Sequence, residues 1–158
     1  MKDYPKPIQK SIFWTSDPGI DPKRVETLVV QLQEQIKVFG LVAEKYKGQL
    51  GVKIVFVSCS SGGMRWISRK KDRHSIVLPI SSEESSEELV QTLFGDLKTL
   101  QHAMVAINNV ANAGILAAEI IAIKDQTLYN RLKKFKRQLR DNVLIQSIKL
   151  LKNQRKSL

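Results

Sequence analysis

The segment VKIVFVSCS, residues 52–60, decides the fold class of this 158-residue chain. Most of its residues are apolar, and Val52, Ile54, Val55 and Val57 are β-branched, which is typical of strands. Apolar and polar residues do not alternate along it. Because helices cover both faces of a parallel sheet, such an uninterrupted run predicts a buried parallel strand.

Similar short apolar runs lie on both sides of this strand. Strands are expected at 11–16, 75–80 and 102–108, whereas 41–46 is either a weak strand or the end of a helical region. Between the strands, SSGGM (60–64) is expected to close the strand as a loop, and a basic turn is expected to follow it up to His74.

Helical patterns separate these strands. Apolar residues recur at helical spacing over 22–38, with Asp21 placed as the N-cap, Pro22 at the first helical position and Gly40 after the end. A further helix is expected after the acidic serine-rich stretch 81–88, and helices are expected from about 109 to about 155. Alternating strands and helices predict an α/β fold: a three-layer α/β/α sandwich with a mostly parallel, flavodoxin-like sheet and a long C-terminal helix.

The length fits one domain over 1–158, with 1–10 as a flexible arm and 124–158 as a basic helical extension. This extension carries eleven Lys/Arg and two Asp/Glu, and so accounts for most of the net charge of +11. Such a run is either a solvated helix face or a contact for a polyanion.

The single cysteine, Cys59, excludes an intrachain disulfide and a cysteine-rich metal site, and it is expected to be a buried thiol at a strand end. A cytoplasmic location is therefore expected. The sequence contains no apolar run long enough to predict a membrane span and no secretory signal at its start.

Ligands of parallel α/β sheets bind at the carboxyl ends of the strands, which here precede the loops 15–21, 58–64 and 80–87. Backbone N–H groups and hydroxyls in such loops can bind a phosphate, and glycine permits the positive φ of an anion-binding loop. Alternatively, the loop 15–21 is an ordinary Pro-Gly turn and the loop 58–64 is an ordinary strand-to-helix turn. The candidate phosphate-binding residues are Ser16, Asp17, Ser58, Ser60, Ser61, Gly62 and Gly63.

The strand MVAIN and the following NVANAGILAAEIIAIKDQTLYNRLKKFK resemble the C-terminal part of the PurE family of purine biosynthesis. Its members are carboxyaminoimidazole ribonucleotide mutases and aminoimidazole ribonucleotide carboxylases. The resemblance covers about 52–145, with VKIVFVSCSSGGM and SIVLPISS similar to two earlier strands and their loops. In the small-residue helix and beyond it, the matching residues are Asn112, Ala113, Leu116, Ala117, Ala118, Ile120, Ile121, Asp125, Leu128 and Leu132.

The resemblance implies a phosphorylated aminoimidazole ribonucleotide as ligand and carboxyl transfer that uses no metal or organic cofactor. It also implies a homo-oligomer, an octamer in the family, in which the small-residue helix packs against the sheet and against neighbouring subunits. The Gly-Ser-x-Ser-Asp signature is not matched, because that place reads TSDPGID (15–21). The Ser-Ala-His-Arg/Lys-x-Pro signature is missing too, and neither His74 nor His102 matches its histidine, so no catalytic residue is assigned.

Three functions are compatible with these residues. The first is a mutase (isomerase) or carboxylase (lyase) of purine biosynthesis. The second is an inactive family member, or pseudoenzyme, that binds a nucleotide or acts as a structural or regulatory oligomer. The third is a basic nucleic-acid-binding protein, although the basic C-terminal helix also carries a regular apolar stripe: Leu128, Leu132, Phe135, Leu139 and Val143.

Overall fold

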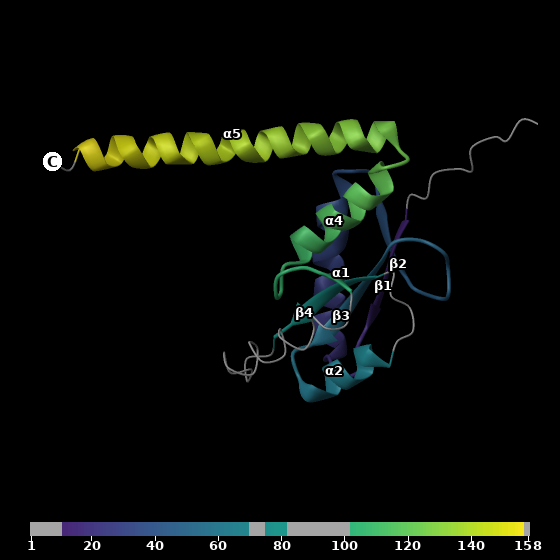
Figure 1. Cartoon of the computed structure of the whole chain (residues 1–158). Coiled ribbons are helices and arrows are strands. Elements are labelled where there is room, and N and C mark those ends of the chain that lie inside the picture. The colour runs from purple at the N-terminus through teal and green to yellow at the C-terminus, as the bar shows by residue number, and fades with distance from the viewer. Residues whose placement is uncertain (1–10, 70–74, 82–101, 157–158) are drawn as a thin grey trace, which may run out of the picture.

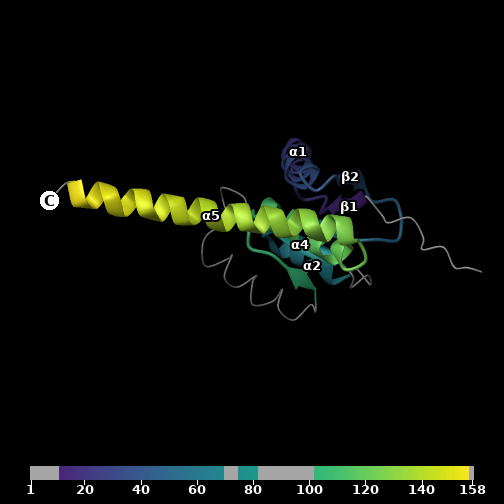
Figure 2. The same ribbon diagram turned by 90° about the horizontal axis from the view of Figure 1, so that it is seen from above.

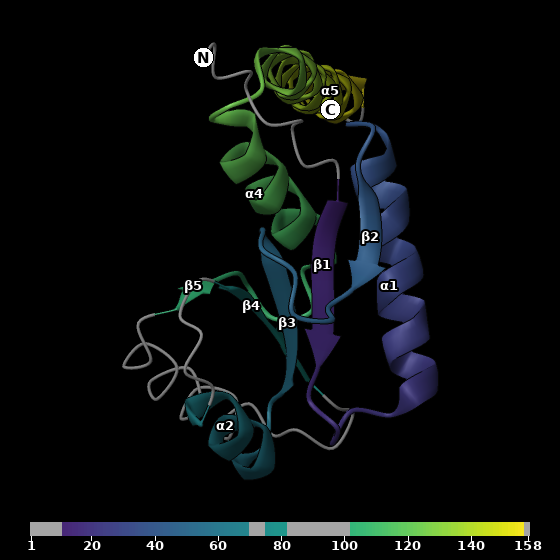
Figure 3. The ribbon, with the colours of Figure 1, turned by 90° about the vertical axis from the view of Figure 1, so that its right-hand side faces the viewer.

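A computed structural model describes residues 11–69, 75–81 and 102–156 of the chain, with side chains described up to residue 150. Its strands form one sheet in the order β2-β1-β3-β4-β5, and every neighbouring pair is parallel. This confirms the predicted flavodoxin-like sheet (Figure 3). The strands are β1 (Ser11–Ser16), β2 (Val42–Lys45), β3 (Lys53–Ser58), β4 (Ser75–Ile80) and β5 (Ala103–Met104).

Helices cover both faces of the sheet. The described helices are α1 (Pro22–Lys37), α2 (Ser61–Ser68), α4 (Val110–Ala122) and α5 (Gln126–Lys156). Helices α1 and α4 lie on one face and α2 on the other (Figures 1 and 3). Alternate residues of β3 separate the two core clusters: Ile54 and Phe56 pack on the α1 and α4 side, and Val55 and Val57 pack with Ile67 of α2. The strand is therefore buried on both faces, as its uninterrupted apolar run predicts.

The small residues of α4 lie against α1. Ala113, Ala117 and Ala118 are fully buried, and a Cβ atom added at Gly114 would lie 3.0 Å from Cγ2 of Ile36 and 3.3 Å from Cδ1 of Leu32. Small side chains thus let the two helices and the sheet approach closely, and they bury area without losing rotamer freedom. The close packing of α1, within the same chain, explains the small residues of α4.

The segment 41–46, for which a weak strand and a helix end were both expected, contains a strand. Its β2 pairs with β1, and the side chain of Gln33 in α1 covers the chain here: its Oε1 accepts from the N–H of Ala43 at 2.8 Å and its Nε2 donates to the carbonyl of Leu41 at 3.3 Å. These bonds connect β2, the edge strand of the sheet, to α1.

Two local predictions were wrong. The segment 61–68 is the helix α2 rather than a loop and basic turn, because Ser60 caps it and Ile67 is buried beneath it. The strand expected over 102–108 is only Ala103–Met104, since the chain leaves the sheet after the N–H of Val105 donates to the carbonyl of Val77. The predictions for the arm 1–10, for His74 and for the helix after 81–88 lie outside the described residues.

The long C-terminal helix α5 is packed only along its first turns. Leu128 and Leu132 are buried. The rings of Phe135 and Phe39 pack edge to face with their centroids 5.1 Å apart, and Nη1 of Arg131 donates to the carbonyl of Phe39 at 2.9 Å. The helix then extends past the body of the molecule (Figures 1 and 2). Five large apolar side chains there are at least half exposed: Val143, Leu144, Ile145, Ile148 and Leu150. None of the described helices is long and apolar enough to cross a membrane.

Candidate functional site

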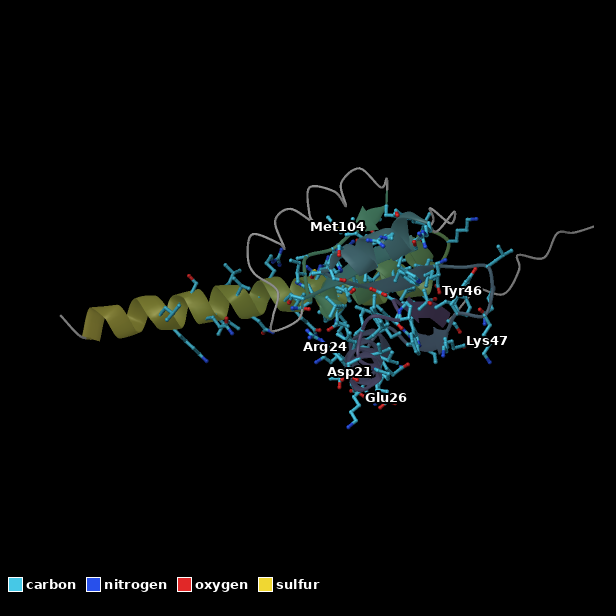
Figure 4. The ribbon with its side chains drawn as sticks, turned by 90° about the horizontal axis from the view of Figure 1, so that it is seen from below. Asp21, Arg24, Glu26, Tyr46, Lys47 and Met104 are labelled. Atoms are coloured by element: carbon cyan, nitrogen blue, oxygen red, sulfur yellow. The ribbon has the colours of Figure 1, made fainter. Side chains whose placement is uncertain are left out.

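The carboxyl ends of β1, β3 and β4 meet at one edge of the sheet. In the register of the strands, Ser16 lies beside Phe56, and Ser58 lies beside Ile80. Figure 4 views the molecule from this end and shows Asp21 and Arg24 at the start of α1. The predicted loops after β1 and β3 are therefore adjacent, as expected for parallel strands.

The carboxylate of Asp17 joins these two loops. It is only 4% exposed. Its Oδ1 accepts from the N–H of Gly19 at 2.8 Å, and its Oδ2 accepts from the N–H of Ser58 at 3.2 Å and from the Ser58 hydroxyl. The carboxylate thus faces into the protein, and three donors satisfy it, so it holds the edge together rather than facing a ligand.

A chain of hydroxyls continues from Asp17 to the start of α2. Oγ of Ser58 and Oγ of Ser60 lie 2.9 Å apart. Because the hydroxyl proton of Ser58 goes to Asp17, Ser60 is the donor in this pair. Oγ of Ser60 also accepts from the N–H of Gly63 at 3.1 Å and so caps α2.

Gly63 is required where it stands, because its Cα lies against β3 and Asp17. A Cβ atom there would overlap the carbonyl of Ser58 and would lie 2.5 Å from its Oγ and 2.8 Å from Oδ2 of Asp17. Gly62 and Ser61 are exposed instead. Their N–H groups belong to the first turn of α2, where a helix has no acceptor of its own, and they can donate to a bound anion.

Arg24 is a cation at this edge that the sequence analysis did not identify. Burial raises the pKa of the Cys59 thiol, and the Arg24 guanidinium lowers it in part. Arg24 is therefore within electrostatic range of Cys59, although 35 positions separate the two residues. Cys59 is buried, as expected, and its raised pKa makes it a poor nucleophile.

Asn108 holds the end of β4 at this edge, and it was not among the predicted site residues. It has a positive φ of 56°, which asparagine tolerates better than most residues. Its Oδ1 accepts from the N–H of Ser81 at 3.1 Å, its Nδ2 donates to Oγ of Ser81 at 2.5 Å, and its own N–H donates to the carbonyl of Pro79 at 2.9 Å. The adjacent Asn109 caps α4. The only signal in the sequence was an Asn-Asn pair between a strand and a helix.

The predicted residues thus lie together at this edge, but some are structural and others are accessible to a ligand. Asp17, Ser58, Ser60 and Gly63 build the loop, whereas Ser61 and Gly62 are accessible. Asp21 caps α1 by accepting from the N–H of Lys23 at 3.3 Å, so the loop after β1 is in part a turn and helix start. No group of three or more metal-ligating side chains occurs among the described residues. Comparison with protein-family models and with curated proteins gave no match to this chain.

Proposed function

We propose that this chain is a PurE-like protein that binds a phosphorylated ribonucleotide at the carboxyl edge of its sheet and does not catalyse carboxyl transfer. The observation that carries the proposal is the hydrogen-bonded chain from Asp17 through Ser58 to Ser60, which places the first turn of α2 at this edge. The phosphate is assigned to the N–H groups of Ser61 and Gly62, with Arg24 as its counter-charge.

The oxygens of Asp17 do not face an anion bound at Ser61 and Gly62. A carboxylate facing the phosphate would repel it. Its three donors and its burial instead direct the charge into the protein, and the exposed Asp21 is engaged with the N-terminus of α1. The positive end of α2 and the Arg24 guanidinium are the groups proposed to attract the phosphate.

The reason for proposing an inactive protein is the lack of a proton-transfer group at this edge within the described part of the chain. Carboxyl transfer needs a group that titrates near neutral pH, and general acid–base catalysis contributes about 100- to 10,000-fold. His102 precedes β5 at the amino end of the sheet, roughly 16 Å from the carboxyl edge by the rise of β4. Asp17 is satisfied by its donors, and the pKa of Cys59 is raised.

The homo-oligomer implied by the resemblance remains part of the proposal. The exposed apolar residues of α5 beyond Leu139 support it, because a helix that is apolar on several sides is normally covered. In such an assembly a neighbouring subunit could supply the missing proton-transfer group. The mutase or carboxylase function would then hold.

Calorimetry with carboxyaminoimidazole ribonucleotide tests the binding, and a spectroscopic assay of the same compound tests turnover. We expect binding without turnover. Arg24→Gln should weaken binding about tenfold or more, since a hydrogen bond to a charged group contributes about 1.5–3 kcal/mol. Lys23→Gln is the matched control, because it removes the same charge from the adjacent position and should change little. Absence of binding would overturn the proposal, and turnover would show that the protein is a mutase or carboxylase instead.

A further inference from the structure

A second candidate site lies at the opposite end of the molecule from the sheet edge, where α4 ends and α5 begins (Figure 1). A groove of about 730 Å³ is formed there by the last turn of α4 and the first four turns of α5. This volume is in the range of small-ligand sites, which are about 300–1,000 Å³. The resemblance stated above assigns no role to this groove.

The floor of the groove is apolar and contains an accessible aromatic ring. Ala122 and Leu132 are buried at its base, while Ile123 is 78% exposed and Tyr129 is 49% exposed. A half-exposed tyrosine beside an apolar floor offers a flat surface on which a planar group can stack.

The rim of the groove is positively charged. Four cations of α5 line it, and two of them have acidic partners: Lys136 pairs with Glu119, and Nη2 of Arg140 lies 3.2 Å from Oδ1 of Asp141. Lys133 and Arg137 have no acidic partner among the described residues. They stand four residues apart, so both project from one face of the helix, one turn from each other.

The apolar stripe of α5 does not compete with this face. Leu128, Leu132 and Phe135 pack against the body of the domain, which orients the helix so that Lys133 and Arg137 face the groove. The first four turns of α5 thus pack on the domain through one face and present cations to the groove on another. Lys133, Arg137 and the ring of Tyr129 are left available to a ligand.

The geometry points to a binding site for single-stranded nucleic acid in the α4–α5 groove, with a base stacked on Tyr129 and successive phosphates on Lys133 and Arg137. Single-stranded nucleic acid combines flat apolar groups with regularly spaced negative charges, and proteins bind it with aromatic rings beside a cationic track. An acidic amphipathic helix is the competing ligand. Such a helix would need an apolar strip along the groove for its apolar face, whereas the groove lining beyond Leu132 is cationic.

The test uses the full chain and a fluorescein-labelled oligouridylate of about 12 nucleotides, with binding followed by fluorescence anisotropy at several salt concentrations. We expect the logarithm of the binding constant to fall with the logarithm of salt concentration with a slope of about −1.4, as for two phosphate contacts on a single strand. Tyr129→Ala should weaken binding roughly 5- to 150-fold, the range for losing one stacked base.

Neighbouring lysines provide the matched control. Lys133→Gln should weaken binding and reduce the magnitude of the slope by about 0.7, because one phosphate contact is lost. Lys134→Gln removes the same charge from the next position, which does not line the groove, and should retain the slope. Thermal unfolding of each variant shows whether it is folded.

Three outcomes would overturn the inference: equal effects of Lys133→Gln and Lys134→Gln, no effect of Tyr129→Ala in a folded variant, or equally tight binding of a poly-glutamate peptide. The site is independent of the sheet edge. Arg24→Gln should leave oligouridylate binding unchanged, so failure of one site is distinguishable from failure of the other.

Discussion

The hydroxyl of Ser58 donates a hydrogen bond to the buried carboxylate of Asp17 and so joins the end of β3 to the end of β1. The two residues lie 41 positions apart in the chain. Ser60 extends the same network to the first turn of α2. A substitution that breaks this network should therefore disturb the candidate phosphate site.

Asp17→Asn should destabilise the protein by about 1–3 kcal/mol. In either orientation the NH2 group of the amide would face a backbone N–H, that of Gly19 or that of Ser58, so a buried donor is left unsatisfied. Urea unfolding measures the change. Asp21→Asn serves as the control, because asparagine is as good an N-cap as aspartate, and it should change stability by less than about 0.5 kcal/mol. Equal effects of the two changes would contradict the assigned role of Asp17.

Gly63→Ala should destabilise the protein by about 1–3 kcal/mol, because the added methyl overlaps the backbone of Ser58 and approaches Asp17. Gly62→Ala is the paired change at the next position of the same helix. Its methyl would lie 3.7 Å from Oγ of Ser60, and alanine is the better helix former, so it should be neutral or stabilising by up to about 1 kcal/mol. Denaturation midpoints of the two variants would show whether the order is correct.

Gly114→Leu should separate α4 from α1 and cost at least about 1–3 kcal/mol, because Ile36, Leu32 and Gln35 already lie within 3.4 Å of a Cβ atom at that position. Ala111→Leu places the same side chain on an exposed position of the same helix and should stay within about 0.5 kcal/mol. A tolerated leucine at 114 would mean that the two helices do not pack as described.

Leu132→Ala should cost about 2–5 kcal/mol, since the residue is 4% exposed between α5 and the body. Leu144→Ala, at a position that is 54% exposed in the isolated chain, should cost well under half of that. Unfolding should be measured at several protein concentrations. A Leu144→Ala cost that appears only at high concentration would show that the distal part of α5 is covered in an assembly.

Alkaline pH should reduce stability through Cys59. Burial raises the pKa of its thiol in the folded protein, so the folded state retains the proton at pH values where the unfolded state has lost it. The unfolding free energy then falls as pH rises from the ordinary thiol pKa through the folded pKa. Cys59→Ala should show a shallower decline over that window in urea titrations. A wild-type slope no steeper than that of the variant would exclude the effect.

The secondary structure that could be predicted from the sequence was that carried by local patterns. The uninterrupted apolar runs at 11–16, 52–60 and 75–80 correspond to β1, β3 and β4, and the helical spacing over 22–38 corresponds to α1. Such patterns report which faces are buried, and burial on both faces requires a parallel sheet covered by helices. The meeting of the loops at 15–21 and 58–64 followed from the same topology.

Packing decided what local patterns left open. The Gly62-Gly63 pair argues against a helix by propensity, yet α2 forms because Ser60 caps it and Ile67 is buried against the sheet. The strand expected over 102–108 ends at Met104 because the chain turns away to reach Asn108 and α4.

The sequence by itself determined the fold class and the edge at which polar residues gather, because hydrophobic patterning and parallel topology are properties of the chain order. Only the tertiary structure decided that the carboxylate of Asp17 faces inward, that Arg24 lies within electrostatic range of Cys59, and that Lys133 and Arg137 line a groove. The physical reason is that hydrogen bonds and charges act over a few ångströms. Which distant residues come within that range depends on how the helices dock on the sheet.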